Sequence, residues 1–359
     1  KGVVANSNSA MEKEEDSLLL SGQSSACPSR AGQPVSDALD LISRNYLTAP
    51  WMEGGLMTLT DSEWTTISTT LGGFTRPNVF ISLPKLHGIV SNEGVSAVPR
   101  VRDVSYSTVN GTDGVANFQA KLYQANSSLC SKEWRIPTLI GPVTVTWMVA
   151  QTGAYNISGE TFFVNQGNIT REDDDAGNGN NRIRLNHPTG CLSASAYCAF
   201  PVGTTSAAIS QLQTLVYDRH LFVRAETSKL RFTKFVLQPH DSADLSYYVM
   251  PEPETLSYMT FARNSRLSCF DIDRADWGVE TQIFNDVTND PLSVTHVNTY
   301  REIPGTFGMV GTIVGLVDST TVRVYEESIS GMSFMLQEDQ CTDLETVHTT
   351  AEDVFMLTM

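Results

Sequence analysis

The stretch from Thr312 to Ile329 reads TIVGLVDSTTVRVYEESI. Its first half is continuously apolar and rich in β-branched residues, which predicts a strand buried on both faces. In its second half Val322 and Val324 alternate with Arg323 and Tyr325, which predicts a strand with one buried face and one face in solvent. The Asp-Ser pair between the halves is typical of a turn. We therefore expect a β-hairpin here, and it needs further strands to be stable in water.

The composition favours a large β-rich protein. The chain has 359 residues, 41% of them hydrophobic and only 18% charged, with 15 Phe and 11 Tyr. This content can form a sizeable core. The net charge of -16 repels phosphate, so the chain itself is not expected to bind nucleic acid strongly unless a basic arm precedes Lys1.

Short strand-like runs separated by turn residues continue through most of the sequence. The clearest is the run around Val143–Val149, in which Val143, Val145, Trp147 and Val149 share one face. Phe232, Phe235 and Leu237 break strict alternation, which predicts a bulge or bend in this run. We expect strands at 56–60, 64–71, 78–84, 101–108, 115–123, 142–150, 160–165, 195–200, 214–225, 230–237, 245–250, 256–262, 278–284 and 293–301, in addition to the hairpin. No repeat of fixed period is evident. The pattern predicts an all-β fold, an antiparallel sandwich or barrel.

The two ends differ from the middle and suggest three segments. Residues 1–50 form a polar arm followed by a short helix that begins near Ser36. Residues 51–336 hold the strands and long surface loops, which could form a projection. In residues 337–359 apolar side chains recur at spacings of three and four, which predicts a C-terminal amphipathic helix.

Few residues suggest catalysis. Among the six histidines none lies in a zinc-binding motif, and no nucleophile elbow or phosphate-binding loop is present. The sequence His240-Asp241-Ser242 mixes the residue types of a hydrolase triad, but adjacent residues on a strand point to opposite faces. The six cysteines form no C-x-x-C pair and are expected to be free thiols. No signal peptide and no membrane-spanning run of about 18 residues is seen.

Two acidic clusters are candidate calcium sites, because calcium prefers six to eight oxygen ligands from acidic loops. The first is Glu172, Asp173, Asp174 and Asp175, in the long loop predicted for residues 166–191. The second contains Asp271 and Asp273, with Arg274 inside it. The alternatives are a solvated acidic loop for the first cluster and internal ion pairing for the second.

The ordering of these features resembles the coat proteins of small icosahedral positive-strand RNA viruses, of the nodavirus and tetravirus kind or from viruses of unicellular algae. The similar parts are the segment Gly311–Ile329, the run Gly141–Val149 and the two flanking arms. The resemblance implies an eight-stranded viral jelly roll with insertions and short terminal helices. It also implies a non-enzymatic subunit that assembles with its own copies into a virion in the host cytoplasm. That shell encloses viral RNA and binds a host receptor through surface loops.

Two other functions remain open. One is a β-sandwich carbohydrate-binding or adhesin module whose 166–191 loop binds calcium and a glycan. The other is a hydrolase in which His220 or His240 meets a carboxylate from a distant segment.

Overall fold

The computed structural model contains only β-strands and connections in the part of the chain that it describes. This part comprises residues 52–70, 72–85, 97–109, 112–124, 142–157, 160–169, 182–186, 206–216, 221–229, 232–239, 252–262, 266–267, 279–298, 300, 302–311, 320–338 and 350–359. All the strand pairs are antiparallel. The all-β prediction is therefore confirmed. The N-terminal arm and its predicted helix lie outside the described residues.

The first third of the described chain forms two three-stranded sheets, which we call the first unit. One sheet has the order β1-β6-β3 and the other has the order β2-β5-β4. The six strands are β1 (Met52–Leu59), β2 (Thr65–Ser68), β3 (Pro77–Ile81), β4 (Ala97–Val109), β5 (Thr112–Gln124) and β6 (Val143–Gln151). The first strand thus pairs with the last, and the second with the last but one.

The same pairing recurs in the middle of the chain, which we call the second unit. Its sheets are β10-β13-β8-β7 and β11-β12-β9. Its strands are β7 (Gly153–Ile157), β8 (Glu160–Ile169), β9 (Arg182–Asn186), β10 (Ser206–Leu212), β11 (Leu221–Lys229), β12 (Phe232–Pro239) and β13 (Glu254–Ala262). Strands β8 to β13 match β1 to β6 in order, and β7 is an added strand that pairs with β8.

The last third repeats the arrangement again and forms the third unit. Its sheets are β14-β15-β20-β17 and β16-β19-β18. Its strands are β14 (Arg266–Leu267), β15 (Val279–Val287), β16 (Leu292–Thr295), β17 (Thr306–Val310), β18 (Thr320–Glu327), β19 (Gly331–Glu338) and β20 (Glu352–Thr358). Strands β15 to β20 match β1 to β6, and β14 occupies the place of β7. The described strands thus form three similar units in place of the single eight-stranded sandwich we expected.

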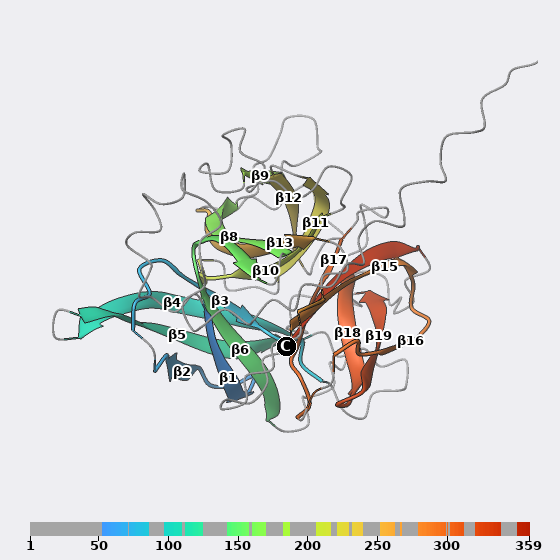
Figure 1. Cartoon of the computed structure of the whole chain (residues 1–359), viewed down its shortest axis with the longest axis horizontal. Helices are drawn as coiled ribbons and strands as arrows, with labels where there is room; N and C mark the ends of the chain where they lie inside the picture. Colours follow the sequence, from blue (N-terminus) through green and yellow to red (C-terminus); the bar gives the residue numbers. More distant parts are fainter. Residues whose placement is uncertain are drawn as a thin grey trace, which may run out of the picture.

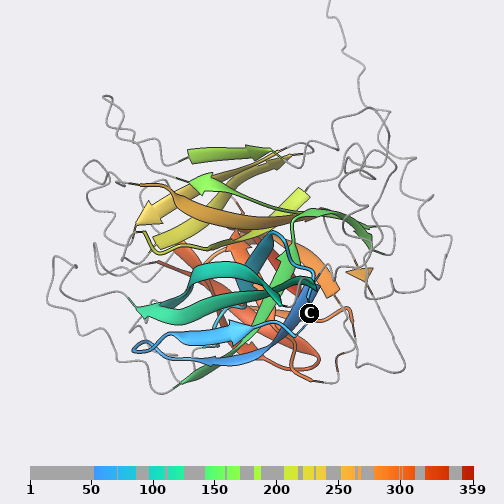
Figure 2. The same cartoon turned by 90° about the vertical axis from the view of Figure 1, so that its left-hand side faces the viewer.

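Figure 1 shows the three units side by side, with β1 to β6 in blue and green, β8 to β13 in green and yellow, and β15 to β20 in orange and red. In Figure 2 the strands of the second unit lie above those of the other two. The fourth and fifth strands of each unit form a hairpin, and the β4–β5 hairpin has a register shift between Ser107 and Val109 with the extra residue in β5. In all three hairpins, an extra residue in the fourth strand also shifts the register. In β4 this bulge contains Asp103 with φ 54°, a conformation that Asp tolerates better than most residues.

A central core joins the units. Each unit contributes a buried pair of facing residues from its third and sixth strands to one hydrophobic cluster: Phe80 with Met148, Ile209 with Met259, and Phe307 with Leu357. Separate clusters fill the spaces between the two sheets of the first and third units. The sheet that carries the sixth strand is therefore covered on both faces, which explains its near-continuous apolar sequences.

Strand β6 shows this two-sided burial directly. Val145, Trp147 and Val149 face the interior of the first unit, whereas Met148 and Ala150 face the central core. The shared face predicted for this run is confirmed.

Two expectations for the C-terminal region are corrected, namely the helix and the exposure of Arg323. The predicted amphipathic helix over 337–359 is wrong at residues 352–358, which form β20 between β15 and β17. Val354 to Leu357 are all buried, and a short buried strand has the same apolar density as one helical face. Strand β18 forms a hairpin with β19 through a turn at 328–330. Residues 312–319 lie outside the described part, so the hairpin expected around Asp318-Ser319 stays a prediction. Arg323 is buried, although it was expected in solvent.

Candidate functional site

The residues predicted to act as sites all lie outside the described part of the chain. This holds for the calcium candidates Glu172 to Asp175, Asp271 and Asp273, and for His220 and His240. Among the described residues, no group of three or more His, Cys, Asp or Glu is arranged to hold a metal ion. The polar chemistry that the structure does describe lies in buried networks within and between the three units.

Two buried ion pairs connect successive units. Arg100 of β4 donates from Nη2 to Glu254 Oε1 of β13 at 3.1 Å and to the carbonyl of Thr214 at 3.0 Å. Arg224 of β11 donates from Nη2 to Glu352 Oε2 of β20. Arg100, Arg224 and both glutamates are almost completely buried. Each arginine belongs to the fourth strand of one unit, and each glutamate begins the sixth strand of the next.

The third arginine at this position has different partners. Arg323 is the fourth residue of β18, as Arg100 and Arg224 are of β4 and β11. It donates from Nη1 to the amide oxygen of Gln337, and among the described residues its Nε and Nη2 have no hydrogen-bond partner. Burial lowers the pKa of Arg323 to about 10.

In two units, a buried carboxylate accepts hydrogen bonds from the segment that follows the second strand. Glu53 of β1 accepts from the backbone N–H of Thr70 at 2.7 Å and from its hydroxyl at 2.9 Å. Glu280 of β15 accepts from the backbone N–H groups of Val297 and Asn298 at 2.8 and 2.9 Å. Thr70 and Val297 each follow the second strand by two residues. The two carboxylates therefore fix the same segment in the two units.

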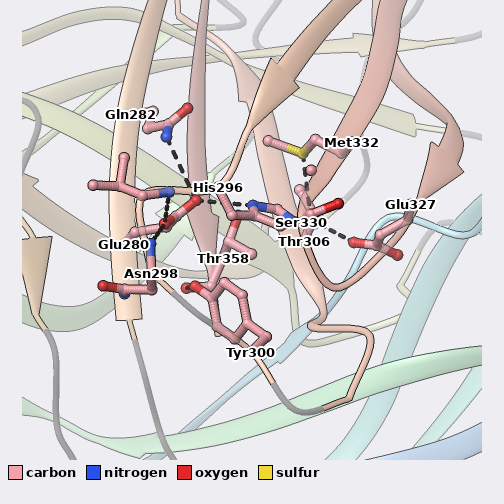
Figure 3. A network of polar contacts seen from close by, with 12 residues as sticks. Glu280, Gln282, His296, Asn298, Tyr300, Thr306, Glu327, Ser330, Met332 and Thr358 are labelled. Carbon is pink, nitrogen blue, oxygen red and sulfur yellow. Dashed lines mark hydrogen bonds and ion pairs between the residues drawn. The ribbon is translucent and has the colours of Figure 1, made fainter.

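The network around Glu280 also contains a histidine (Figure 3). His296 Nδ1 lies 2.9 Å from Glu280 Oε1, and the ring packs edge-on against Tyr300 with centroids 5.1 Å apart. Burial and the nearby charge of Glu280 raise the pKa of Tyr300, whose hydroxyl donates to the carbonyl of Thr358. Because the ionised carboxylate only accepts, the imidazole Nδ1 carries the proton in this pair.

A carboxylate-oriented imidazole is one part of a general-base site, which also requires a nucleophile or substrate at the other nitrogen. His296 Nε2 is buried and has no hydrogen-bond partner among the described residues. The pair therefore orders the loop after β16 and does not form a hydrolytic triad within the described chain.

Glu327 at the end of β18 lies in the same region. Burial raises the pKa of its carboxyl, although the Thr306 hydroxyl at 2.6 Å and the nearby His296 and Lys85 act in the opposite direction. Lys85 of the first unit reaches the carbonyl of Glu327 at 3.5 Å, which links the first and third units.

Sequence reasoning missed these networks, although a signal is present. The arginines lie in the tripeptides Pro99-Arg-Val, Val223-Arg-Ala and Val322-Arg-Val, each with small or β-branched neighbours. An arginine in a strand normally faces solvent, so this pattern indicates buried arginines only once the three strands are known to be equivalent.

Comparisons with known proteins add no family. No family model matches the chain, and no curated protein and no solved structure is significantly similar to it. In the described part of the chain, we find no helix of the length and apolar character that would cross a membrane.

Proposed function

We propose that this chain is a structural, non-enzymatic subunit that assembles with its own copies into an icosahedral shell around a viral RNA genome. The observation that carries the proposal is the arrangement of three similar sandwiches around one core. In each, strands pair first with last and second with last but one, which is the nested pairing of a rolled hairpin. This supports a jelly-roll-like unit with six strands in place of eight. A chain with this threefold design suits a position at a local threefold axis of a shell.

The surface of the third unit favours self-association. Four large apolar side chains of this unit are exposed, namely Leu292, Val297, Ile303 and Ile329. The backbone N–H of His296 donates to the carbonyl of Ser330, so Val297 and Ile329 lie on neighbouring segments. Apolar side chains that come together on a surface are typical of contacts between proteins. Viral RNA and a host receptor are the further partners that this proposal implies.

Expression of the chain by itself tests the proposal. We expect particles of uniform size in negative-stain micrographs and in sedimentation. The double variant Val297→Ser/Ile329→Ser should shift the protein towards small species, whereas Val216→Ser, an exposed apolar residue of the second unit, serves as the matched control. A strictly monomeric wild-type profile across a range of salt and pH would overturn the assembly function.

A second candidate function is carbohydrate binding, and one surface of the first unit favours it. The exposed face of the β2-β5-β4 sheet carries Tyr123 and the adjoining Trp64 with polar neighbours. The Arg102 guanidinium lies 4.0 Å from the Trp64 ring centroid and donates to Gln119 at 2.8 Å. Aromatic and polar side chains on a flat face are suited to sugar rings. A glycan-array signal that is lost in Trp64→Ala would favour this function, and its loss with chelator would also implicate calcium.

A further inference from the structure

In each of the three units, the fourth residue of the fourth strand is an arginine, and the first residue of the sixth strand occupies a second equivalent position. The residue that begins each sixth strand pairs with the last residue of the first strand of its unit: Leu59 with Val143, Ile169 with Glu254, and Val287 with Glu352. The carboxylates of Glu254 and Glu352 bind the arginine of the preceding unit. The first unit follows the third around the ring of three units. The position equivalent to the two glutamates is therefore Val143 for Arg323, and valine carries no acid.

The chemistry of Arg323 fits a carboxylate. Its Nη1 is used by Gln337, whereas the two nitrogens without partners are Nε and Nη2. The N–H groups of these two nitrogens point in the same direction and form a fork that can bind both oxygens of one carboxylate. The side chain is only 4% exposed, so the positive charge is removed from water, and no acid of the described part of the chain pairs with it.

The first and third units contact each other directly, and one contact reaches the end of the strand that carries this arginine. The N–H of Leu83, which follows β3, donates to the carbonyl of Thr306 at 2.7 Å, and Leu83 packs against the interior of the third unit. Lys85 reaches the end of β18, the strand that carries Arg323. In the junction of the first and second units, the corresponding contact includes the carbonyl of Thr214, which follows β10 and accepts from Arg100.

We propose that Arg323 is the anchor of a carboxylate-binding site at the junction of the third and first units. A single carboxylate supplies one negative charge and two coplanar acceptors. At the equivalent arginines, Glu254 and Glu352 each supply the charge and accept from Nη2. The carboxylate comes either from a small free acid or from an acidic side chain of a second copy of this chain. The proposal does not depend on the shell function.

Thermal unfolding of the full chain in sodium formate tests the site, with sodium chloride at equal ionic strength as the reference. Formate should raise the wild-type Tm saturably by about 2–4 °C relative to chloride. Arg323→Met keeps the apolar stem but removes the fork, so its Tm should not respond to formate. Val143→Glu places an acid at the equivalent position, which should raise the Tm in chloride and abolish the formate response.

Thr144→Glu is the matched control, because Thr144 is exposed and its side chain points to the other face of β6. It should respond to formate as the wild type does. Equal Tm values of the wild type in formate and chloride would overturn the site. An Arg323→Met response that matches the wild type would also overturn it. If Val143→Glu fails to fold, the comparison of the formate responses of the wild type and Arg323→Met still tests the site.

Sedimentation in chloride then distinguishes the two sources of the carboxylate. If a second copy supplies it, Arg323→Met should form smaller species than the wild type, and formate should dissociate wild-type assemblies. If a free acid supplies it, the two proteins should sediment alike.

Discussion

At the scale of single residues, the most informative side chains are charged groups removed from water. Arg100 and Arg224 are tolerated in the interior because each meets a buried glutamate of the next unit. Removing one member of such a pair leaves the other charge buried and uncompensated, which is more harmful than replacing both by apolar residues. The ion pairs therefore hold neighbouring units in one arrangement.

The Glu254→Ala variant should lower the free energy of unfolding by about 3–5 kcal/mol, because Arg100 then remains buried without its acid. Urea unfolding monitored by circular dichroism measures the loss. Glu252→Ala is the control, since Glu252 is exposed and lies two residues away. Recovery of stability in the double variant Arg100→Met/Glu254→Leu would support this cause. An equal loss in Glu252→Ala would contradict it.

A second prediction at this scale concerns the pH dependence due to Glu327. Burial raises its pKa above the ordinary value of 4.5, so the folded state binds this proton more tightly than the unfolded state does. The contribution of Glu327 to stability therefore falls as the pH rises from about 4.5 through the higher folded pKa. In Glu327→Gln the amide stays neutral and can still accept from Thr306.

The Tm of Glu327→Gln minus that of the wild type should therefore be small at low pH and should increase with pH across the mildly acidic range. A Tm series in overlapping buffers measures this difference. Glu326→Gln, an exposed neighbour, serves as the control. A difference that stays constant with pH would contradict the raised pKa.

At the scale of strands, alternation and turn residues predicted much of the sheet content. The runs at 115–123, 142–150 and 256–262 lie within β5, β6 and β13 with small boundary errors. The β11–β12 ladder has a bulge opposite Phe235, but its extra residue lies on β11 and not in the run 232–237, where a bulge or bend was expected. The run at 214–225 is wrong in its bounds, since β10 ends at Leu212 and β11 begins at Leu221. Backbone pairing, which local sequence does not encode, sets these limits.

Close packing between neighbouring strands makes Gly331 a sensitive position. A Cβ added there would lie 2.3 Å from the backbone oxygen of Val294 in β16, and a backbone atom cannot move aside easily. Gly331→Ala should lower the free energy of unfolding by about 1–3 kcal/mol. Gly55→Ala is a milder comparison, because its nearest atoms belong to the side chain of Trp147 at 3.1 Å. Equal stabilities in thermal unfolding would contradict the ranking.

At the scale of the whole molecule, the structure is a ring-like set of three units that share one core. Facing residues of the third and sixth strands meet at its centre, and polar contacts cross the junctions. For example, the side chain of Gln213 bonds both the N–H and the carbonyl of Val79 in the neighbouring unit. A core built in this way depends on all three units together.

Truncation of the equivalent central residues should therefore have similar effects in all three units. Met148→Ala, Met259→Ala and Leu357→Ala should each lower the free energy of unfolding by about 2–5 kcal/mol, because each opens a cavity in the central core. Calorimetry of the full chain measures these losses. Leu292→Ala, an exposed apolar residue, should change stability little. A loss confined to one unit would indicate that the units unfold independently.

The sequence by itself determined the all-β class and the faces of strands such as β6, because side-chain alternation and turn residues act locally. Only the tertiary structure decided the threefold design, the strand at 352–358 and the burial of three arginines. The sequences from Val143 (VTVTWM) and Glu254 (ETLSYM) are similar position by position, yet the similarity appears only after strand pairing aligns them. A few matching side chains separated by loops of unequal length give no regular period. Whether a charge is buried depends on the neighbouring unit, which lies far away in the chain.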